Sequence, residues 1–210
     1  MDNWNDVWQK NTEKGDDPCL INGFEHCENN INSYELFKHI IQVNNIDKFE
    51  KILDFGCGSG RLGKYFIDED YNYCGVDKSL NMINKFKTLL NYENVYTINS
   101  NKLPFEDNSF DIVFCYSVMQ YLNSLDDFKF VLNEFIRVSK RMIYIGDLES
   151  IDHSLNNKKY YKYNSTLKHL IINKKYIPDL NLKYKINMDT LCCTRNSRYN
   201  CIINKNDYVF

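Results

Sequence analysis

Three of the eight glycines in this chain of 210 residues stand within five positions, at Gly56, Gly58 and Gly60, directly after the strand-like run 51–55. A strand that turns through such a loop into a helix needs glycine for two reasons. The backbone turns sharply there, and a ligand approaches where any Cβ would collide. The spacing therefore predicts a strand, a ligand-binding loop and a helix in succession.

Strand and helix patterns alternate from this loop onward. Apolar residues at helical spacing separate four further strands, predicted at 71–76, 95–98, 110–116 and 141–145. Two late strands, at 182–187 and 199–204, leave no room for a crossover helix between them. They predict an antiparallel hairpin at the edge of an otherwise parallel, doubly wound α/β sheet.

The segments outside this alternation are less regular. We expect residues 1–30 to be irregular and residues 31–41 to form a helix with one apolar side. Ser124, followed three positions later by Asp127, predicts the capped start of a long helix. At about 150 residues per domain, the length fits one domain with modest additions.

The formal net charge of −2 hides a strong asymmetry. Residues 158–210 hold eleven Lys and Arg against three Asp and Glu, a balance of +8, so residues 1–157 carry −10. The basic segment either keeps the chain soluble or faces an anionic substrate. A chain so near neutrality, with no added recognition domain, is not typical of nucleic-acid-binding proteins.

Targeting and metal signals are not found in the sequence. It has no run of about 18 apolar residues and no signal-peptide pattern at its start, so we expect a cytoplasmic protein without a membrane segment. We expect it to be a monomer or a homodimer. The eight cysteines include no Cys-x-x-Cys pair, so no metal site is predicted. Cys57, Cys74 and Cys115 lie in or beside strands, where buried free thiols are the usual interpretation.

The ligand of the glycine loop has two interpretations. Residues 58–63 satisfy G-x-G-x-x-G and Asp77 follows about twenty positions on, as in a nicotinamide dinucleotide site. However, Asp54 at the strand end would repel a pyrophosphate and attract an ammonium group. Asp77 can accept hydrogen bonds from both hydroxyls of a ribose. These two carboxylates favour S-adenosylmethionine, and a nicotinamide dehydrogenase is the weaker alternative.

Three segments in order closely resemble the successive motifs of class I S-adenosylmethionine-dependent methyltransferases. They are Lys51-Ile-Leu-Asp-Phe-Gly-Cys-Gly-Ser-Gly60, Gly75-Val-Asp-Lys-Ser79 and Leu103-Pro-Phe-Glu-Asp-Asn-Ser-Phe-Asp111. The resemblance implies an α/β fold with a Rossmann-like seven-stranded, mostly parallel sheet, an antiparallel last strand and helices on both faces. It also implies S-adenosylmethionine as cofactor, with S-adenosylhomocysteine as product.

The same resemblance assigns cofactor contacts to individual residues. Asp54 would meet the methionyl ammonium, Gly56 and Gly58 the amino-acid portion, and Asp77 the ribose. Lys78, next to Asp77, is also expected to contact the cofactor. Asn99 stands where the family commonly has an Asp that accepts the adenine amino group, and an Asn carbonyl can still accept. The remaining expected contacts are Ser100 beside Asn99, and Tyr116 with Ser117 at the methyl end.

Both ends of the chain carry a further pattern, Asn5-Asp-Val-Trp8 with Asn22-Gly-Phe24 at the start and Asn196-Ser-Arg-Tyr-Asn-Cys-Ile-Ile203 at the end. These segments resemble the lid and final strand of a subgroup found in clusters that build surface carbohydrates. That likeness places Trp8 and Phe24 over the cofactor and Asn196, Arg198 and Tyr199 near the acceptor. It suggests one methyltransferase domain over 1–210, made of an N-terminal lid and helix (1–45), a cofactor-binding core (46–146) and an acceptor-side segment with the hairpin (147–210).

The range of possible acceptors is narrowed mainly by motifs that the sequence lacks. The [Asp/Asn]-Pro-Pro-[Tyr/Phe] motif of base-modifying amino methyltransferases is missing after residue 116, so nucleic acid is a minor alternative. Gln120 stands where many relatives have His, so a general base must lie elsewhere, and Asp147, Glu149 and His153 are the candidates. We expect O-methylation of a small anionic acceptor, a nucleotide-linked sugar or phosphorylated metabolite, with Arg198 on the phosphate. Alternatives are RNA methylation and a non-catalytic, methyltransferase-like binding partner.

Overall fold

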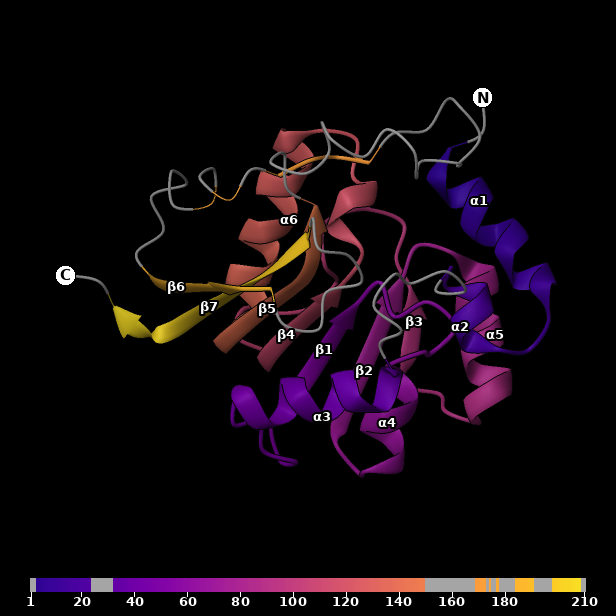
Figure 1. Ribbon diagram of the computed structural model, residues 1–210, viewed down its shortest axis with the longest axis horizontal. Helices are drawn as coiled ribbons and strands as arrows, with labels where there is room; N and C mark the ends of the chain where they lie inside the picture. Colours follow the sequence, from indigo (N-terminus) through magenta and orange to yellow (C-terminus); the bar gives the residue numbers. More distant parts are fainter. Residues whose placement is uncertain are drawn as a thin grey trace.

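A seven-stranded sheet forms the centre of the computed structural model, which describes residues 3–23, 32–149, 169–172, 174, 177, 184–190 and 198–208 (Figure 1). Its order is β3-β2-β1-β4-β5-β7-β6. The strands are β1 (Lys51–Phe55), β2 (Asn72–Asp77), β3 (Val95–Thr97), β4 (Phe110–Tyr116), β5 (Ser139–Glu149), β6 (Tyr184–Asp189) and β7 (Arg198–Tyr208).

Strands β1 to β5 pair in parallel, whereas β7 runs antiparallel to both β5 and β6. The predicted Rossmann-like sheet and its antiparallel hairpin are therefore confirmed. The fifth strand is longer than predicted, since it continues from residue 145 to Glu149, where it pairs with Arg198. This extension carries the expected acceptor-side residues Asp147 and Glu149.

Helices cover both faces of the sheet (Figure 1). They are α1 (Trp4–Asn11), α2 (Pro18–Ile21), α3 (Ser33–Val43), α4 (Gly63–Asp68), α5 (Leu80–Leu90) and α6 (Leu125–Val138), with short 3-10 turns at Thr12–Lys14 and Met119–Tyr121. Leu53 belongs to the core under α6, and its neighbour Ile52 to the core under α3, α4 and α5. This alternation is what a strand buried on both faces requires.

Two helix starts show how local sequence sets the boundaries. The predicted cap of α6 is confirmed, because the Ser124 hydroxyl accepts a hydrogen bond from the Asp127 amide at 3.1 Å. The expectation that residues 1–30 are irregular is wrong for α1. There Asn3 and Asp6 form a reciprocal capping box, and Trp4 and Trp8, four positions apart, lie on one side of the helix.

None of the helices among the described residues is long and apolar enough to cross a membrane. The cysteines at 57, 74 and 115 are buried free thiols, as predicted.

Candidate active site

The glycine loop follows β1 and turns tightly against the end of β2. The amides of Gly56 and Cys57 both donate to the Val76 carbonyl, at 2.7 and 3.1 Å. Gly58 has φ of +55°, and a Cβ added there would collide with the side-chain oxygen of Asn22. Glycine is favoured at this position, because it adopts a left-handed φ at no steric cost and leaves room for the Asn22 side chain.

Asp77 ties the loop to the next helix from the end of β2. Its two carboxylate oxygens accept the amides of Gly58, at 3.0 Å, and of Ser79, at 2.8 Å. The Ser79 hydroxyl in turn caps α5 by accepting the Met82 amide. Burial raises the pKa of Asp77, against the opposing effect of these amides. The carboxylate is thus held in one orientation, and each oxygen keeps a second lone pair for a ligand hydroxyl.

Asp54 is buried at the end of β1, where only 4% of its surface is exposed. The Tyr73 hydroxyl donates to it at 2.7 Å. Burial raises the pKa of Asp54 to about 7, with Tyr73 opposing the shift and Asp77 adding to it. A cation bound beside this carboxyl would favour its ionised form.

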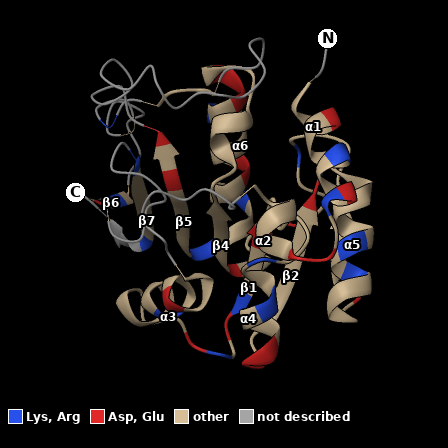
Figure 2. Cartoon of the chain, turned by 45° about the vertical axis from the view of Figure 1, so that its right-hand side comes forward, with Lys and Arg blue, Asp and Glu red and all other residues tan. Residues whose placement is uncertain are grey.

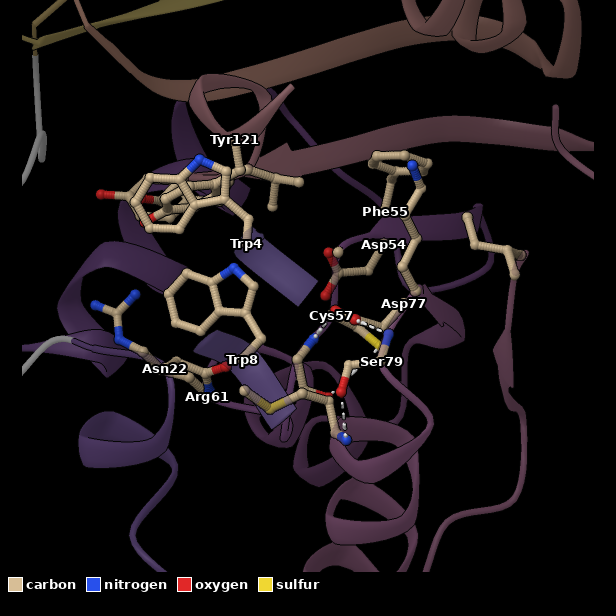
Figure 3. A pocket seen from close by; sticks show the side chains of 18 of the residues that line it. Trp4, Trp8, Asn22, Asp54, Phe55, Cys57, Arg61, Asp77, Ser79 and Tyr121 are labelled. Atoms are coloured by element: carbon tan, nitrogen blue, oxygen red, sulfur yellow. Dashed lines mark hydrogen bonds between the residues drawn. The ribbon is translucent and has the colours of Figure 1, made fainter. Parts of the chain in front are cut away.

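A single cavity of about 1060 Å³, counting its open mouth, connects these residues to an aromatic wall. The glycine loop, Asp54 and Asp77 line one part, and Trp4, Trp8, Tyr116 and Tyr121 line the other. Figure 3 shows Trp4 and Tyr121 together at one end, Trp8 below them, and the carboxylates of Asp54 and Asp77 on the opposite side.

The aromatic wall is assembled from distant parts of the chain. The Tyr121 ring lies 4.8 Å from that of Trp4 and 5.0 Å from that of Trp8, measured between centroids. Helix α1 therefore packs its two tryptophans against the turn after β4. Ser117, at the start of that turn, has φ of +58° and donates its amide to the Gly146 carbonyl.

A buried ionic cluster lies at the carboxyl end of β5 and the start of β7, where Figure 2 shows acidic residues at the tip of β5. Arg198 pairs with Asp147 at 2.5 Å and with Glu149 at 3.7 Å. Although burial alone would lower it, these partners raise the pKa of Arg198. Glu149 also meets the Nδ1 atom of His169 at 3.1 Å.

His169 joins this cluster to the aromatic wall. Its ring lies 5.2 Å from that of Trp4 and 5.1 Å from that of Tyr121. Backbone hydrogen bonds from Leu170 to Gln120 and from Ile172 to Glu149 hold the segment in place.

Comparison with known proteins identifies the cavity-bearing part of the chain. A family model described as a methyltransferase domain matches residues 53–142, which span the glycine loop, Asp77 and Tyr116. This segment of the chain is therefore similar to a methyltransferase domain. The sheet of the chain as a whole and the cavity at the carboxyl ends of its strands agree with this similarity.

Among the chain's relatives is an uncharacterised protein of Methanocaldococcus jannaschii, 37% identical over 100 residues that cover 45% of this chain and 40% of that protein. The matches span 40% of the length of each of the first curated relatives. A crystal structure titled as a SAM-dependent methyltransferase of Methanosarcina mazei has a TM-score of 0.64 at 19% identity, covering 78% of this chain and 95% of that one. Phosphoethanolamine N-methyltransferase 1 of Haemonchus contortus has a TM-score of 0.66 at 15% identity, covering 94% and 47% respectively.

Most residues expected to hold the cofactor line this cavity. Those lining it are Trp8, Asp54, Gly56, Gly58, Asp77, Lys78, Tyr116 and Ser117. Lys78 donates to the Asn101 side chain at 2.6 Å, and burial lowers its pKa. Asn99 and Ser100 are exposed and do not line the cavity, although their neighbour Ile98 does.

The residues expected on the acceptor side lie differently. Asp147, Glu149 and Arg198 are buried in the ionic cluster and do not line the cavity. The Arg198 guanidinium is held by Asp147 and Glu149 and also donates to the Ser117 hydroxyl at 3.3 Å, so its contact with an acceptor phosphate stays a prediction. Tyr199 is also buried and donates its hydroxyl to the Ile172 carbonyl at 2.9 Å. Phe24, His153 and Asn196 lie outside the described residues.

Several residues that line the cavity have no role predicted from the sequence, among them Trp4, Arg61 and Tyr121. A signal existed for Trp4, whose four-residue spacing from Trp8 matches one helical turn, and for Arg61, which directly follows the glycine loop.

Proposed function

We propose that this protein transfers a methyl group from S-adenosylmethionine to a small acceptor held against the aromatic wall. The observation that supports this most is the continuity of one cavity, from the glycine loop and the two carboxylates to the aromatic wall. A cofactor bound along the loop would extend its reactive end toward Tyr116, Ser117 and Tyr121. An acceptor then fits between that end and the rings of Trp4 and Trp8.

The residues of the domain bind and orient in this proposal. Asp54 takes the ammonium group, Gly58 allows close approach of the amino-acid portion, and Asp77 takes the ribose hydroxyls. The bound cofactor supplies an electrophilic methyl group on sulfur. Aligning acceptor and methyl donor accounts for much of the rate, because positioning alone can contribute about 7–11 kcal/mol. The aromatic wall excludes water from the reacting atoms.

We propose a small anionic acceptor, such as a nucleotide-linked sugar or a phosphorylated metabolite, with oxygen as the methylated atom. Two observations support the charge. The segment 158–210 carries a balance of +8. The phosphoethanolamine N-methyltransferase, whose structure was solved with a phosphate-bearing acceptor, covers 94% of this chain.

In this proposal a residue of the acceptor-side segment 147–210 removes the proton from the acceptor. Of the candidates, Asp147 and Glu149 are held in ion pairs, and His153 stays a candidate. We propose that Glu149 acts as a positioning residue for His169, which contacts two rings of the wall.

The test measures S-adenosylhomocysteine released from S-adenosylmethionine with a panel of phosphorylated sugars, nucleotide sugars and their neutral counterparts. The proposal predicts turnover with a phosphorylated member of the panel, and its loss in Asp77→Asn. Asp126→Asn is the matched control, because that side chain is 94% exposed on α6. Cofactor binding without turnover on any acceptor, RNA included, would favour the non-catalytic alternative.

A further inference from the structure

Arg61 is a buried cation in the wall of the cavity. It directly follows the glycine loop, and only 6% of its surface is exposed. Its guanidinium carbon lies 5.9 Å from the centroid of the Tyr116 ring, within the range of a cation–π contact. Figure 3 shows its side chain on the side of Trp8 that faces away from Asp54 and Asp77.

The charged residues that line the cavity are separated in space. Among the described lining residues, Asp54 and Asp77 carry negative charge, and Lys78 lies next to Asp77 and donates to Asn101. Arg61 instead lies at the aromatic part, beside Tyr116. The cavity therefore has an acidic part that suits ammonium and hydroxyl groups and a cationic position near the proposed methyl-transfer point.

We propose that Arg61 is the anion-binding residue of this cavity, and that it holds a carboxylate or phosphate group of a bound molecule beside the Tyr116 ring. A planar guanidinium binds such groups with two parallel hydrogen bonds, and it does so more strongly when water is excluded. Arg198, the cation first expected in this role, is bound by Asp147 and Glu149 instead. The assignment rests on the proposed function.

The anionic group has two possible sources, the carboxylate of the cofactor's amino-acid portion and an anionic group of the acceptor. 5′-Methylthioadenosine separates them, because it carries the adenosine of S-adenosylhomocysteine without the carboxylate. The experiment is calorimetric titration of wild type, Arg61→Gln and Arg61→Lys with both nucleosides. Each protein saturated with S-adenosylhomocysteine is then titrated with glucose 1-phosphate and with inorganic phosphate.

If the cofactor supplies the group, Arg61→Gln weakens the binding of S-adenosylhomocysteine by roughly tenfold or more and leaves the affinity for methylthioadenosine unchanged. If the acceptor supplies it, both nucleosides bind as in wild type and binding of the phosphate probes is lost. Arg61→Lys keeps the charge but not the paired geometry, so its loss is smaller. Lys78→Gln is the matched control, because its position beside the ribose-binding Asp77 predicts equal effects on the two nucleosides.

The assignment is overturned if Arg61→Gln binds both nucleosides and the phosphate probes as tightly as wild type does. It is also overturned if the substitution lowers the affinity for the two nucleosides equally. Thermal unfolding of each variant checks that it folds, and Arg61→Lys carries the same test if Arg61→Gln does not. Wild-type protein that binds neither nucleoside would contradict the proposed function itself, which is a distinct outcome.

Discussion

The cofactor affinity should depend on pH through Asp54. Burial raises the pKa of this carboxyl to about 7, and only its ionised form attracts the ammonium group of the cofactor. With a pKa of about 7, the ionised fraction falls about tenfold between pH 8 and pH 6, which corresponds to about 1.4 kcal/mol of binding free energy. We therefore expect S-adenosylhomocysteine to bind about tenfold more weakly at pH 6 than at pH 8.

Calorimetric titrations of wild type and Asp54→Asn at pH 6, 7 and 8 measure this dependence. The Asn variant should bind weakly at all three pH values and lose the slope, since its amide does not titrate. 5′-Methylthioadenosine, which lacks the ammonium group, should bind wild type without the slope. A flat affinity for S-adenosylhomocysteine in wild type, or the same slope in Asp54→Asn, would refute the role given to Asp54.

The same pKa has a consequence for stability. A carboxyl whose pKa is higher in the folded than in the unfolded state makes the ligand-free protein lose stability as pH rises from about 4 to 7. A shift from 3.8 to about 7 corresponds to a loss on the order of 4 kcal/mol. Asp54→Asn should remove this loss and raise the unfolding temperature at pH 8 relative to wild type. An unchanged or lower temperature would contradict this account of the burial.

Three further outcomes are expected. Gly58→Ala should abolish S-adenosylhomocysteine binding and lower the unfolding free energy by at least about 1–2 kcal/mol, because alanine would have to adopt a left-handed φ and its Cβ would meet Asn22. Wild-type affinity of this variant in calorimetry would contradict the prediction. Ser124→Ala should cost about 1 kcal/mol through the lost cap of α6, a fall of about 2–4 °C in unfolding temperature without a change in cofactor affinity. Asp147→Ala should lower the free energy of unfolding, measured in urea, by about 3–5 kcal/mol, because it leaves Arg198 buried with only the more distant Glu149 as partner. A loss under about 1 kcal/mol would show that the ion pair is unimportant for stability.

The cofactor half of the site could be predicted because its residues are close in sequence to the strands that place them. Asp54 and Asp77 each end a strand, and parallel neighbours bring those ends together. Their positions therefore follow from local patterns and one general rule of α/β sheets.

The acceptor half depends on contacts between distant segments. Arg198 could be recognised as a cation in the sequence, but its burial with Asp147 and Glu149 follows from the antiparallel register that pairs Glu149 with Arg198. Strand prediction alone does not fix that register. None of the side chains of helix α1 is fully buried, and its two tryptophans acquire a role only by docking on Tyr121.

The central claim is that the cavity binds the nucleoside cofactor of a methyltransferase. Equilibrium titration with S-adenosylhomocysteine, followed by tryptophan fluorescence, tests it most directly, because the only two tryptophans of the chain, Trp4 and Trp8, both line the cavity. The account predicts saturable binding at one site per chain with a change in emission, lost in Asp77→Asn and retained in Asp126→Asn. Binding of NAD in preference to S-adenosylhomocysteine, or binding that Asp77→Asn leaves intact, would contradict it.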